Sequence, residues 1–474
     1  MKILILGAGR VGESVAESLV SEQNDITVID TNPQRLAALQ DRLDLRGVVG
    51  NGIQPSVLRD AGAEDADMLI ACAPLDETNL VACKVAQEVF NIPTRIARVR
   101  SPEFTDGSPL LGKQGFAVDE VICPEESVTT TIRKLIEYPE ALQVLEFSQQ
   151  RVSLIAVRAV EGGPLVHHVI SELPQLVPEV PMRIVAIYRS DPLGPDKQIT
   201  CDGTTRIEAG DEVFVLAANE NIRRVLDALR QRSDPVKRVM IAGGGRVGLR
   251  LARYIAGDCY VKLIETSAQR CEYLTTQLPD KTLVLHGDTT DEELLEAENV
   301  EDTDLFLALT SDDEDNIMSC LLAKRMGAKR VLALINRRAY ADLVQGQGTQ
   351  IDIAISPSQA VIGELLAHVR RGDVVAVYSL RRGAAEALEA IARGDRRSSK
   401  VVGRRIEELA LPPGAQIGAI VRDVQIGESQ VRKDVIIPHH DTVIQTDDHV
   451  IVFVPKKRMV RQVEKLFQVG ATFF

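Results

Sequence analysis

The chain has 474 residues, of which 45% are apolar, 26% are charged and 4% are aromatic, and it contains no Trp. At about 150 residues per domain, this length predicts roughly three domains, and the composition excludes intrinsic disorder. The formal net charge of −13 argues against nucleic-acid and anionic-lipid partners, because the average surface repels phosphate. Any phosphate group must therefore be held by a local device.

The seven Cys are scattered, with no CxxC pair, which is typical of a reduced, cytosolic, metal-free protein. The chain runs from Lys2 directly into ILILGAG, without the features of a signal peptide. No apolar run approaches the length that crosses a bilayer. We therefore expect a cytoplasmic protein that contacts a membrane only through a partner.

The second half of the chain repeats the first. ILILGAGRVGESVAESL, from Ile3, returns as RVMIAGGGRVGLRLARYI, from Arg238, and DADMLIACAPLDETNLVAC, from Asp65, returns as DTDLFLALTSDDEDNIMSC, from Asp302. The matching landmarks are separated by a nearly constant distance of about half the chain, which indicates a tandem duplication.

Each half begins with short apolar runs that alternate with helical periodicity. In the first half these runs are ILILG, ITVID, GVVGN, DMLIACA, TRIARVR and VDEVICP. The alternation predicts βαβ units and a parallel sheet. From about residue 141, shorter alternating runs such as VSLIAVRAV and MRIVAIYR predict a small α+β unit. A related set follows residue 373, with GAAEALEAIARGD at 383–395 predicted as an extra helix.

The fold class predicted is α/β, with two tandem Rossmann-like parallel-sheet domains, each followed by a small α+β domain. The predicted boundaries are 1–140, 141–232, 233–372 and 373–474. One mixed domain in each half is the alternative.

Two glycine-rich loops each follow a predicted strand and open a predicted helix. They are Gly7, Ala8, Gly9, Arg10, Val11 and Gly12 in the first half, and Gly243, Gly244, Gly245, Arg246, Val247 and Gly248 in the second. This context predicts that a diphosphate binds at the helix N-terminus. Asp30 and Glu265 end the next strands. A carboxylate there accepts ribose hydroxyls and repels a 2′-phosphate, which favours NAD(H) or an adenine nucleotide over NADP(H).

Further candidate contacts follow the third, fourth and fifth strands of each half. Asn51 and Asp288 are placed to flank the adenine, and Ala73, Pro74 and Thr310 face the crevice at the carboxyl edge of the sheet. Asn79 and Asn316 open the next helices, as ligand contacts or as helix caps. Arg98 is a candidate phosphate partner. We match it to Ala333 in the second half, so the two sites are not chemically identical.

Catalytic residues are not predicted. The first His is His167, beyond the first nucleotide-binding domain, and no GxSxG, HExxH or Walker-type motif occurs. The paired histidines show no metal-ligand spacing. A Lys or Tyr acid that no motif reveals stays open, so an NAD-dependent oxidoreductase of unknown substrate is the alternative to a sensor that binds nucleotides without turnover.

The chain resembles the TrkA family, whose members are cytosolic regulatory subunits of bacterial Trk potassium uptake systems. The resemblance covers essentially the full length and rests on GAGRVG with Asp30, DETN at 76–79, and the strings RIARVRSPE, LAKRMGAK, YADLVQ, AISP and LRRGAAEA. It implies two RCK (regulator of potassium conductance) units in tandem.

The resemblance further implies a homotetrameric gating ring on the inner face of the cell inner membrane. The ring would be biased by NAD(H), ATP or ADP and would act on a Trk-type potassium channel subunit. Family contacts map onto Gly7 to Val11, Asp30, Ala73, Pro74 and Arg98, and onto Gly243 to Val247, Glu265 and Thr310.

Overall fold

The computed structural model describes the chain except residues 21, 23, 102–103, 105–107, 179, 192–195, 231–233, 345–350, 370–372, 382–383, 427–429 and 470–474. The chain forms two compact units. One consists of Met1–Val128, Leu334–Leu343 and Ala354–Leu365, and the other of Thr129–Ala333, Val344–Ile353 and Leu366–Phe474.

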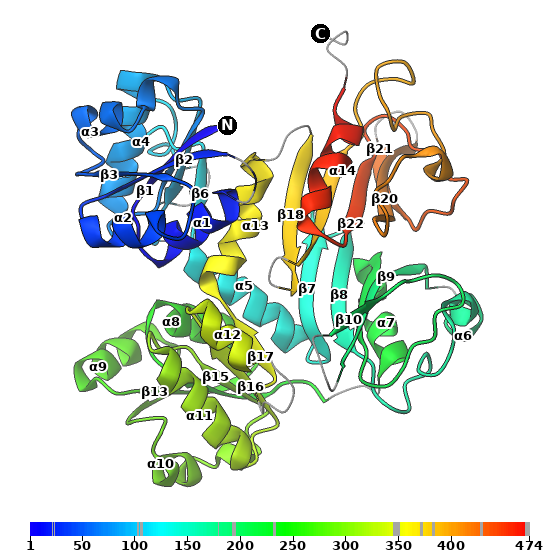
Figure 1. The fold of residues 1–474 in the computed structure, drawn as a ribbon. Coiled ribbons are helices and arrows are strands. Elements are labelled where there is room, and N and C mark those ends of the chain that lie inside the picture. The colour runs from blue at the N-terminus through cyan, green and yellow to red at the C-terminus, as the bar shows by residue number, and fades with distance from the viewer. Residues whose placement is uncertain are drawn as a thin grey trace. The chain divides into compact units, whose positions relative to one another are not determined.

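The first parallel sheet has six strands in the order β3-β2-β1-β4-β5-β6 (Figure 1). This order, with a reversal beside β1, is that of the doubly wound nucleotide-binding fold. The strands are β1 Lys2–Leu6, β2 Asp25–Asp30, β3 Arg46–Val49, β4 Met68–Ala71, β5 Thr94–Arg98 and β6 Glu120–Ile122. The helices are α1 Arg10–Val20, α2 Pro33–Gln40, α3 Pro55–Asp60, α4 Asp76–Phe90 and α5 Pro124–Glu137.

The predicted strands of this sheet are apolar on both faces because helices cover both. Leu4 and Leu6 belong to one core cluster with Leu58 of α3 and Leu80 of α4. The alternate residue Ile5 points to the opposite face and is also fully buried. Strand runs without polar alternation are the consequence.

The second parallel sheet repeats the first, in the order β14-β13-β12-β15-β16-β17. Its strands are β12 Arg238–Ala242, β13 Tyr260–Glu265, β14 Leu283–His286, β15 Leu305–Ala308, β16 Arg330–Leu334 and β17 Ile353–Ile355. The helices that follow its strands are α8 Arg246–Ile255, α9 Ala268–Gln277, α10 Glu292–Ala297, α11 Asp313–Arg325, α12 Arg338–Val344 and α13 Pro357–Val369. The predicted fold class, two Rossmann-like sheets in tandem, is confirmed.

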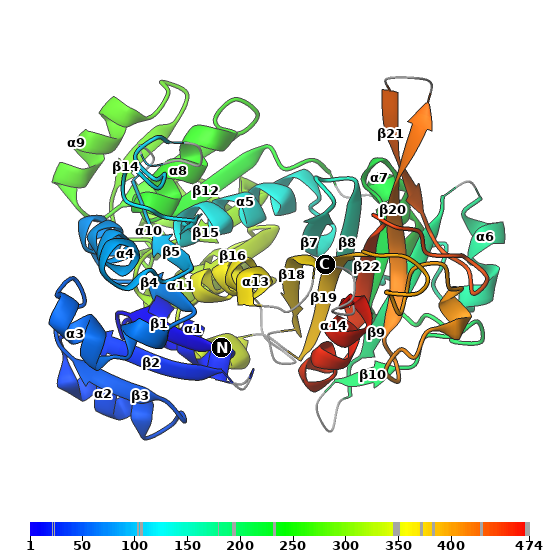
Figure 2. The same cartoon turned by 90° about the horizontal axis from the view of Figure 1, so that it is seen from above.

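Two antiparallel five-stranded sheets form the small α+β parts. The first small sheet consists of β7 Ala141–Phe147, β8 Val152–Arg158, β9 Met182–Arg189, β10 Lys197–Ile199 and β11 Glu212–Ala218, with helices α6 Leu173–Leu176 and α7 Ile222–Leu229. The second small sheet consists of β18 Val374–Leu380, β19 Ala385–Ile391, β20 Gln416–Ile426, β21 Gln430–Ile436 and β22 His449–Val454, with helix α14 Val460–Phe467. The β20–β21 hairpin projects beyond the rest of its sheet (Figure 2).

The helix predicted within residues 383–395 is wrong, because Ala385–Ile391 forms β19, paired with β18 and β22. Alanine, leucine and glutamate favour helices in isolation. Six of the seven residues of β19 are buried, so packing between two neighbouring strands overrides that preference.

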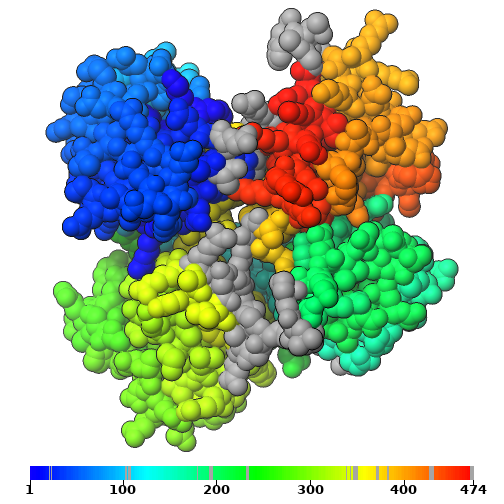
Figure 3. Space-filling model, viewed as in Figure 1, coloured from blue at the N-terminus to red at the C-terminus, as the bar shows by residue number. Residues whose placement is uncertain are grey.

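The two small sheets share one apolar core. Phe147 and Phe214 of the first and Ile451 and Phe453 of the second belong to the same buried cluster, and the two segments adjoin in the space-filling view (Figure 3). Arg381 adds an ion pair to Glu212 at 2.6 Å. The small sheets therefore pack as one body.

The predicted domain boundary between residues 232 and 233 lies outside the described residues, and residue 372 of the next boundary does too. The division into four domains stays a prediction.

Candidate functional site

The two glycine loops have the same geometry. Gly7 and Gly243, which follow β1 and β12, have φ of 103° and 102°, a conformation that side chains disfavour. A Cβ on Gly12 would lie 1.9 Å from the carbonyl oxygen of Gly7, whereas a Cβ on Gly9 would meet nothing within 4 Å. The third glycine is therefore needed for packing of the helix, and the second leaves open space beside the loop.

Gly245 and Gly248 repeat this contrast in the second half, with open space at Gly245 and a Gly248 Cβ 2.0 Å from Gly243 O. The open space borders the first turns of α1 and α8, where unpaired backbone N–H groups favour an anion. Arg10 and Arg246, the first helical residues, are exposed there, whereas Val11 and Val247 are buried. A diphosphate fits such a cradle.

The predicted carboxylates point at the glycine loops. Asp30 Oδ2 accepts a hydrogen bond of 2.6 Å from the backbone N–H of Ala8, and Asp30 Oδ1 accepts one of 2.8 Å from Asn32 N–H. Glu265 Oε2 likewise accepts a bond of 2.9 Å from the Gly244 N–H. These bonds fix the acid at the end of the second strand, beside the loop, where a ribose would lie.

The residues after the third strands make local turns. Asn51 Oδ1 accepts the N–H of Ile53 at 3.2 Å, and Asp288 Oδ1 accepts the N–H and the hydroxyl of Thr290 at 2.9 and 2.8 Å. Asn51 and Asp288 are exposed, so both can still face a ligand, and this role stays a prediction.

Asn79 and Asn316 hold the loops after β4 and β15. Asn79 Oδ1 accepts the N–H of Ala73 at 2.8 Å, and its amide donates to the carbonyls of Ala73 and Arg98 at 3.0 and 2.8 Å. Asn316 makes the equivalent pair of bonds with Thr310 at 2.9 and 3.1 Å. Both side chains are fully buried, and their hydrogen bonds hold the backbone of the crevice edge in place.

Arg98 ends β5, and its Nη2 lies 3.5 Å from Glu125 Oε1. Its buried Nε has no hydrogen-bond partner in the part of the chain that the structure describes. A long contact with one carboxylate leaves donors of this guanidinium available to an anion.

The match of Arg98 to Ala333 is wrong by one residue. Ala97 pairs with Ala71 on the first sheet and Ala333 pairs with Ala308 on the second, so Ala333 occupies the position of Ala97. Leu334 therefore stands where the first half has Arg98, and the second half still lacks this arginine.

Two arginines near the loops were not predicted. Arg270 Nε donates to the carbonyl of Gly244 at 2.9 Å, and Arg100 donates to the carbonyl of Pro74 and pairs with Asp76 at 3.3 Å. Pro74 is exposed at this edge. The repeat aligns Arg270 with Arg35, five residues after each acid, and this recurrence is the signal that could have found the position.

Two buried thiols lie near the first glycine loop. Burial raises the pKa of the Cys72 thiol to about 12, against the pull of Arg98, and burial likewise raises that of Cys83 to about 12. Both thiols therefore stay protonated and are poor nucleophiles.

Within the described ranges, no three His, Cys, Asp or Glu side chains gather as metal ligands. In the same ranges, no helix has the length and apolarity to span a bilayer.

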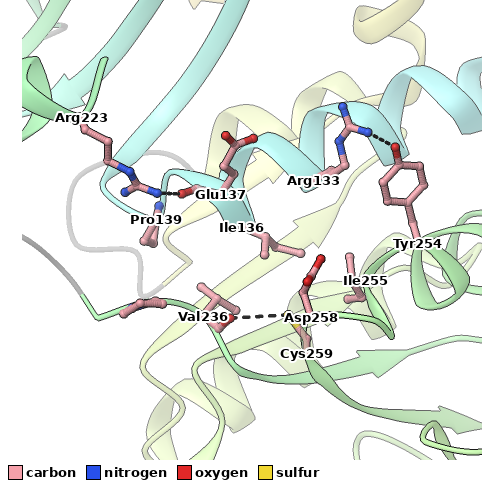
Figure 4. Close-up of a pocket in the computed structure, with 11 residues that line it drawn as sticks. Arg133, Ile136, Glu137, Pro139, Arg223, Val236, Tyr254, Ile255, Asp258 and Cys259 are labelled. Carbon is pink, nitrogen blue, oxygen red and sulfur yellow. Dashed lines mark hydrogen bonds between the residues drawn. The ribbon is translucent and has the colours of Figure 1, made fainter. Parts of the chain in front are cut away.

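A cavity of about 360 Å³ lies between α5, α7 and α8 (Figure 4). Its lining includes Arg133, Arg223, Tyr254 and Asp258 but none of the predicted site residues. The glycine-loop crevices are the candidate sites because they combine open space with anion-binding groups.

Comparisons with known proteins agree with this architecture. The TrkA-N domain family matches residues 3–124 and 239–357, and the TrkA-C domain family matches 154–230 and 396–468. The Trk system potassium uptake protein TrkA of Halomonas elongata is 54% identical over 474 residues, which cover 100% of both chains.

Two solved structures share the fold. The crystal structure of the GsuK RCK domain has a TM-score of 0.58 and 17% identity, and the match covers 98% of this chain and 94% of that one. The GsuK channel bound to NAD has a TM-score of 0.58 and 16% identity, over 98% of this chain and 78% of that one. From its two TrkA-N and two TrkA-C matches and its full-length identity to such a protein, we conclude that the chain belongs to the TrkA family of Trk system potassium uptake proteins.

Proposed function

We propose that the protein is a nonenzymatic, nucleotide-sensing regulatory subunit of a membrane potassium uptake system. The observation that carries this proposal is the duplicated glycine loop, in which a carboxylate is fixed beside open space at a helix N-terminus in both halves. The family's name supplies the transport process, and the absence of a predicted acid, base or nucleophile at the loops favours binding without turnover.

The proposed ligands are NAD(H), with ATP or ADP as competitors. In the first site, Gly7 to Gly12 would hold the diphosphate, Asp30 the ribose, and Arg98 a phosphate. Gly243 to Gly248 and Glu265 would do the same in the second site. When bound, the nucleotide adds charge and contacts between the loop and the crevice edge; the chain's own part is to orient it and to report its presence.

Nucleotide occupancy would act by shifting the population of two conformations that the membrane subunit distinguishes. A ligand changes this balance only through its different affinity for the two conformations. We propose a homotetrameric ring in the cytoplasm, peripheral on the inner face of the inner membrane, whose contact with the membrane is made by the potassium channel subunit. Four domains, with the boundaries given above, would build each subunit.

Titration calorimetry of Asp30→Ala and Glu265→Ala tests the binding sites. Each variant should weaken NADH binding in its own half at least about tenfold, since a charged hydrogen bond to ribose contributes about 1.5–3 kcal/mol. The other half is the internal control.

Potassium flux through the reconstituted membrane subunit, with and without this protein and titrated with NADH, ATP and ADP, tests regulation. Flux that ignores every nucleotide in the presence of the intact protein would contradict the proposal.

A further inference from the structure

The residues around the two crevices differ in charge at matched positions. Three neutral residues of the first half are matched by carboxylates in the second: Asn51 by Asp288, Leu75 by Asp312, and Thr78 by Asp315. All three acids are exposed. They lie in the loops and helix start that follow β14 and β15, at the carboxyl edge of the sheet, where ligands of this fold bind.

Asp315 lies close enough to Asp288 and Asp312 to be affected by their charges. Partial desolvation of the carboxyl, and then repulsion from Asp312, Asp288 and Glu314, raises the pKa of Asp315. Asp312 is also tied to this turn, because its side chain accepts the N–H of Asp315 at 3.0 Å. The edge of the second crevice is therefore a region of negative potential.

At the two positions that match Arg98 and Arg100 the second half has neutral residues, and its nearest arginine, the exposed Arg337, follows one residue later. Arg98 ends β5, whereas Leu334 ends β16. The next arginine along the chain, Arg100, whose guanidinium holds the Pro74 carbonyl, is matched by Asn336. The unpartnered buried Nε of Arg98 points to an anion as the group that the first half is built to receive.

In the helices after the glycine loops, the matched residues make the second half more positive, but the charged residues among them already have partners. Glu13 of α1 is matched by Leu249 and Ser14 by Arg250. Glu13 already pairs with Arg42 at 2.9 Å, and Arg250 has a partner of its own. The dominant difference is therefore the one at the ends of the third to fifth strands.

We infer that the two crevices select nucleotides by charge. Resting on the proposed function, this inference assigns nucleoside triphosphates to the first crevice, with Arg98 as a specificity-determining residue. The second crevice favours the less charged dinucleotide and rejects a triphosphate that lacks a divalent cation, because Asp288, Asp312 and Asp315 repel the additional phosphate charge.

The test measures each crevice alone in the full chain. Gly245→Leu fills the open space of the second loop and leaves the first crevice to be titrated, and Gly9→Leu does the reverse. Calorimetry with ATP in EDTA, and separately with NADH, gives for each crevice the dissociation constant of ATP divided by that of NADH. We expect this ratio to be about tenfold higher in the second crevice, and the difference to shrink in high salt or with Mg²⁺.

Matched exchanges then assign the cause. Asp288→Asn, Asp312→Leu and Asp315→Thr together give the second crevice the residues of the first and should lower its ratio about tenfold. Asp280→Asn is the control, since this exposed acid precedes β14 at the opposite edge of the sheet. Arg98→Leu should weaken ATP binding in the first crevice more than NADH binding.

Ratios that differ less than threefold between the crevices would overturn the selection by charge while leaving nucleotide sensing intact. A triple exchange that changes the ratio no more than the control does would also overturn it. Failure of both crevices to bind either nucleotide would instead refute the proposed function, and this inference with it.

Discussion

The first and second halves of the chain hold their glycine loops with the same hydrogen bonds, although the side chains that make them differ. Asp30 accepts the N–H of Ala8 in one half, and the longer Glu265 accepts that of Gly244 in the other. The amides of Asn79 and Asn316 brace the next loop in both. Contacts that shape the backbone have been kept through the duplication.

Other side chains have diverged, and at the crevice edge and on the buried small-sheet strand they have become more acidic in the second half. The strand register matches Ala156 of β8 with Glu389 of β19. Glu389 accepts the N–H and the hydroxyl of Ser148, both at 2.9 Å, and contacts His449 at 2.5 Å. The comparison teaches that the shared scaffold and the local charge of each half can be altered separately.

The largest expected effect concerns the third glycine of each loop. Gly12→Ala and Gly248→Ala should each lower the free energy of unfolding by about 3 kcal/mol, because the new methyl group would collide with a backbone carbonyl. Nucleotide binding in the same half should be lost. Urea unfolding and calorimetry measure the two effects.

The second glycine of each loop provides the matched control. Gly9→Ala and Gly245→Ala place a methyl group in open space, so stability should change by less than about 1 kcal/mol. Binding should still weaken because the methyl group enters the diphosphate space. Equal stability losses for Gly9→Ala and Gly12→Ala would show that a clash at Gly12 alone does not explain the destabilisation.

Replacing the buried asparagines should have the next largest effect. Asn79→Ala and Asn316→Ala should each lower the free energy of unfolding by about 2 kcal/mol, because buried N–H and C=O groups lose their partners. Thr78→Ala, one residue before Asn79, is the control. A loss in one half only would show that the two amides are not equivalent, contrary to their hydrogen bonds.

The parallel sheets could be predicted from the sequence because their strands are continuous apolar runs that are bounded by Gly or Asp and occur again in the second half. The glycine loops and their acids could be predicted for the same reason: spacing along the chain fixes their place on the fold. β19 could not, since AEALEAI has helical propensity, and only the neighbouring strands β18 and β22 decide its conformation.

Side-chain partners were also beyond the sequence. Asn79 was predicted as a ligand contact or a cap, but its position under the Ala73 loop depends on the depth of α4 against the sheet. The match of Arg98 to Ala333 failed because the spacing between the two repeats is not constant along the chain, so only strand pairing fixes which residues correspond. Leu334 became visible only through pairing of β16 with β15.

A smaller, pH-dependent effect is expected for Glu389. Burial alone would raise its pKa, but hydrogen bonds from His449 and Ser148 outweigh burial and hold the pKa below its ordinary value. A carboxyl with a depressed pKa in the folded state contributes stability above its unfolded pKa and loses it as the pH falls through the folded one. That loss should occur below about pH 4.5.

Glu389→Gln should therefore lower the free energy of unfolding by about 1.5 kcal/mol at pH 7, and this loss should become smaller as the pH falls below the ordinary pKa of Glu. Urea unfolding at several pH values measures this, with the exposed Asp280→Asn as the reference. A variant whose destabilisation grows as the pH falls would show that the ionised carboxylate is not the stabilising form.

The smallest effect separates scaffold from charge at a single position. Asp312 caps α11 through the N–H of Asp315, whereas Leu75, at the same place before α4, is 61% exposed and makes no capping bond. Leu75→Asp should therefore stabilise the first half by about 0.5–1 kcal/mol. The same carboxylate should weaken ATP binding in the first crevice by about threefold at low salt, with Leu75→Asn as the uncharged cap. Stability and triphosphate affinity then move in opposite directions for Asp but not for Asn, and a parallel gain in both would mean that the edge of the crevice does not sense ligand charge.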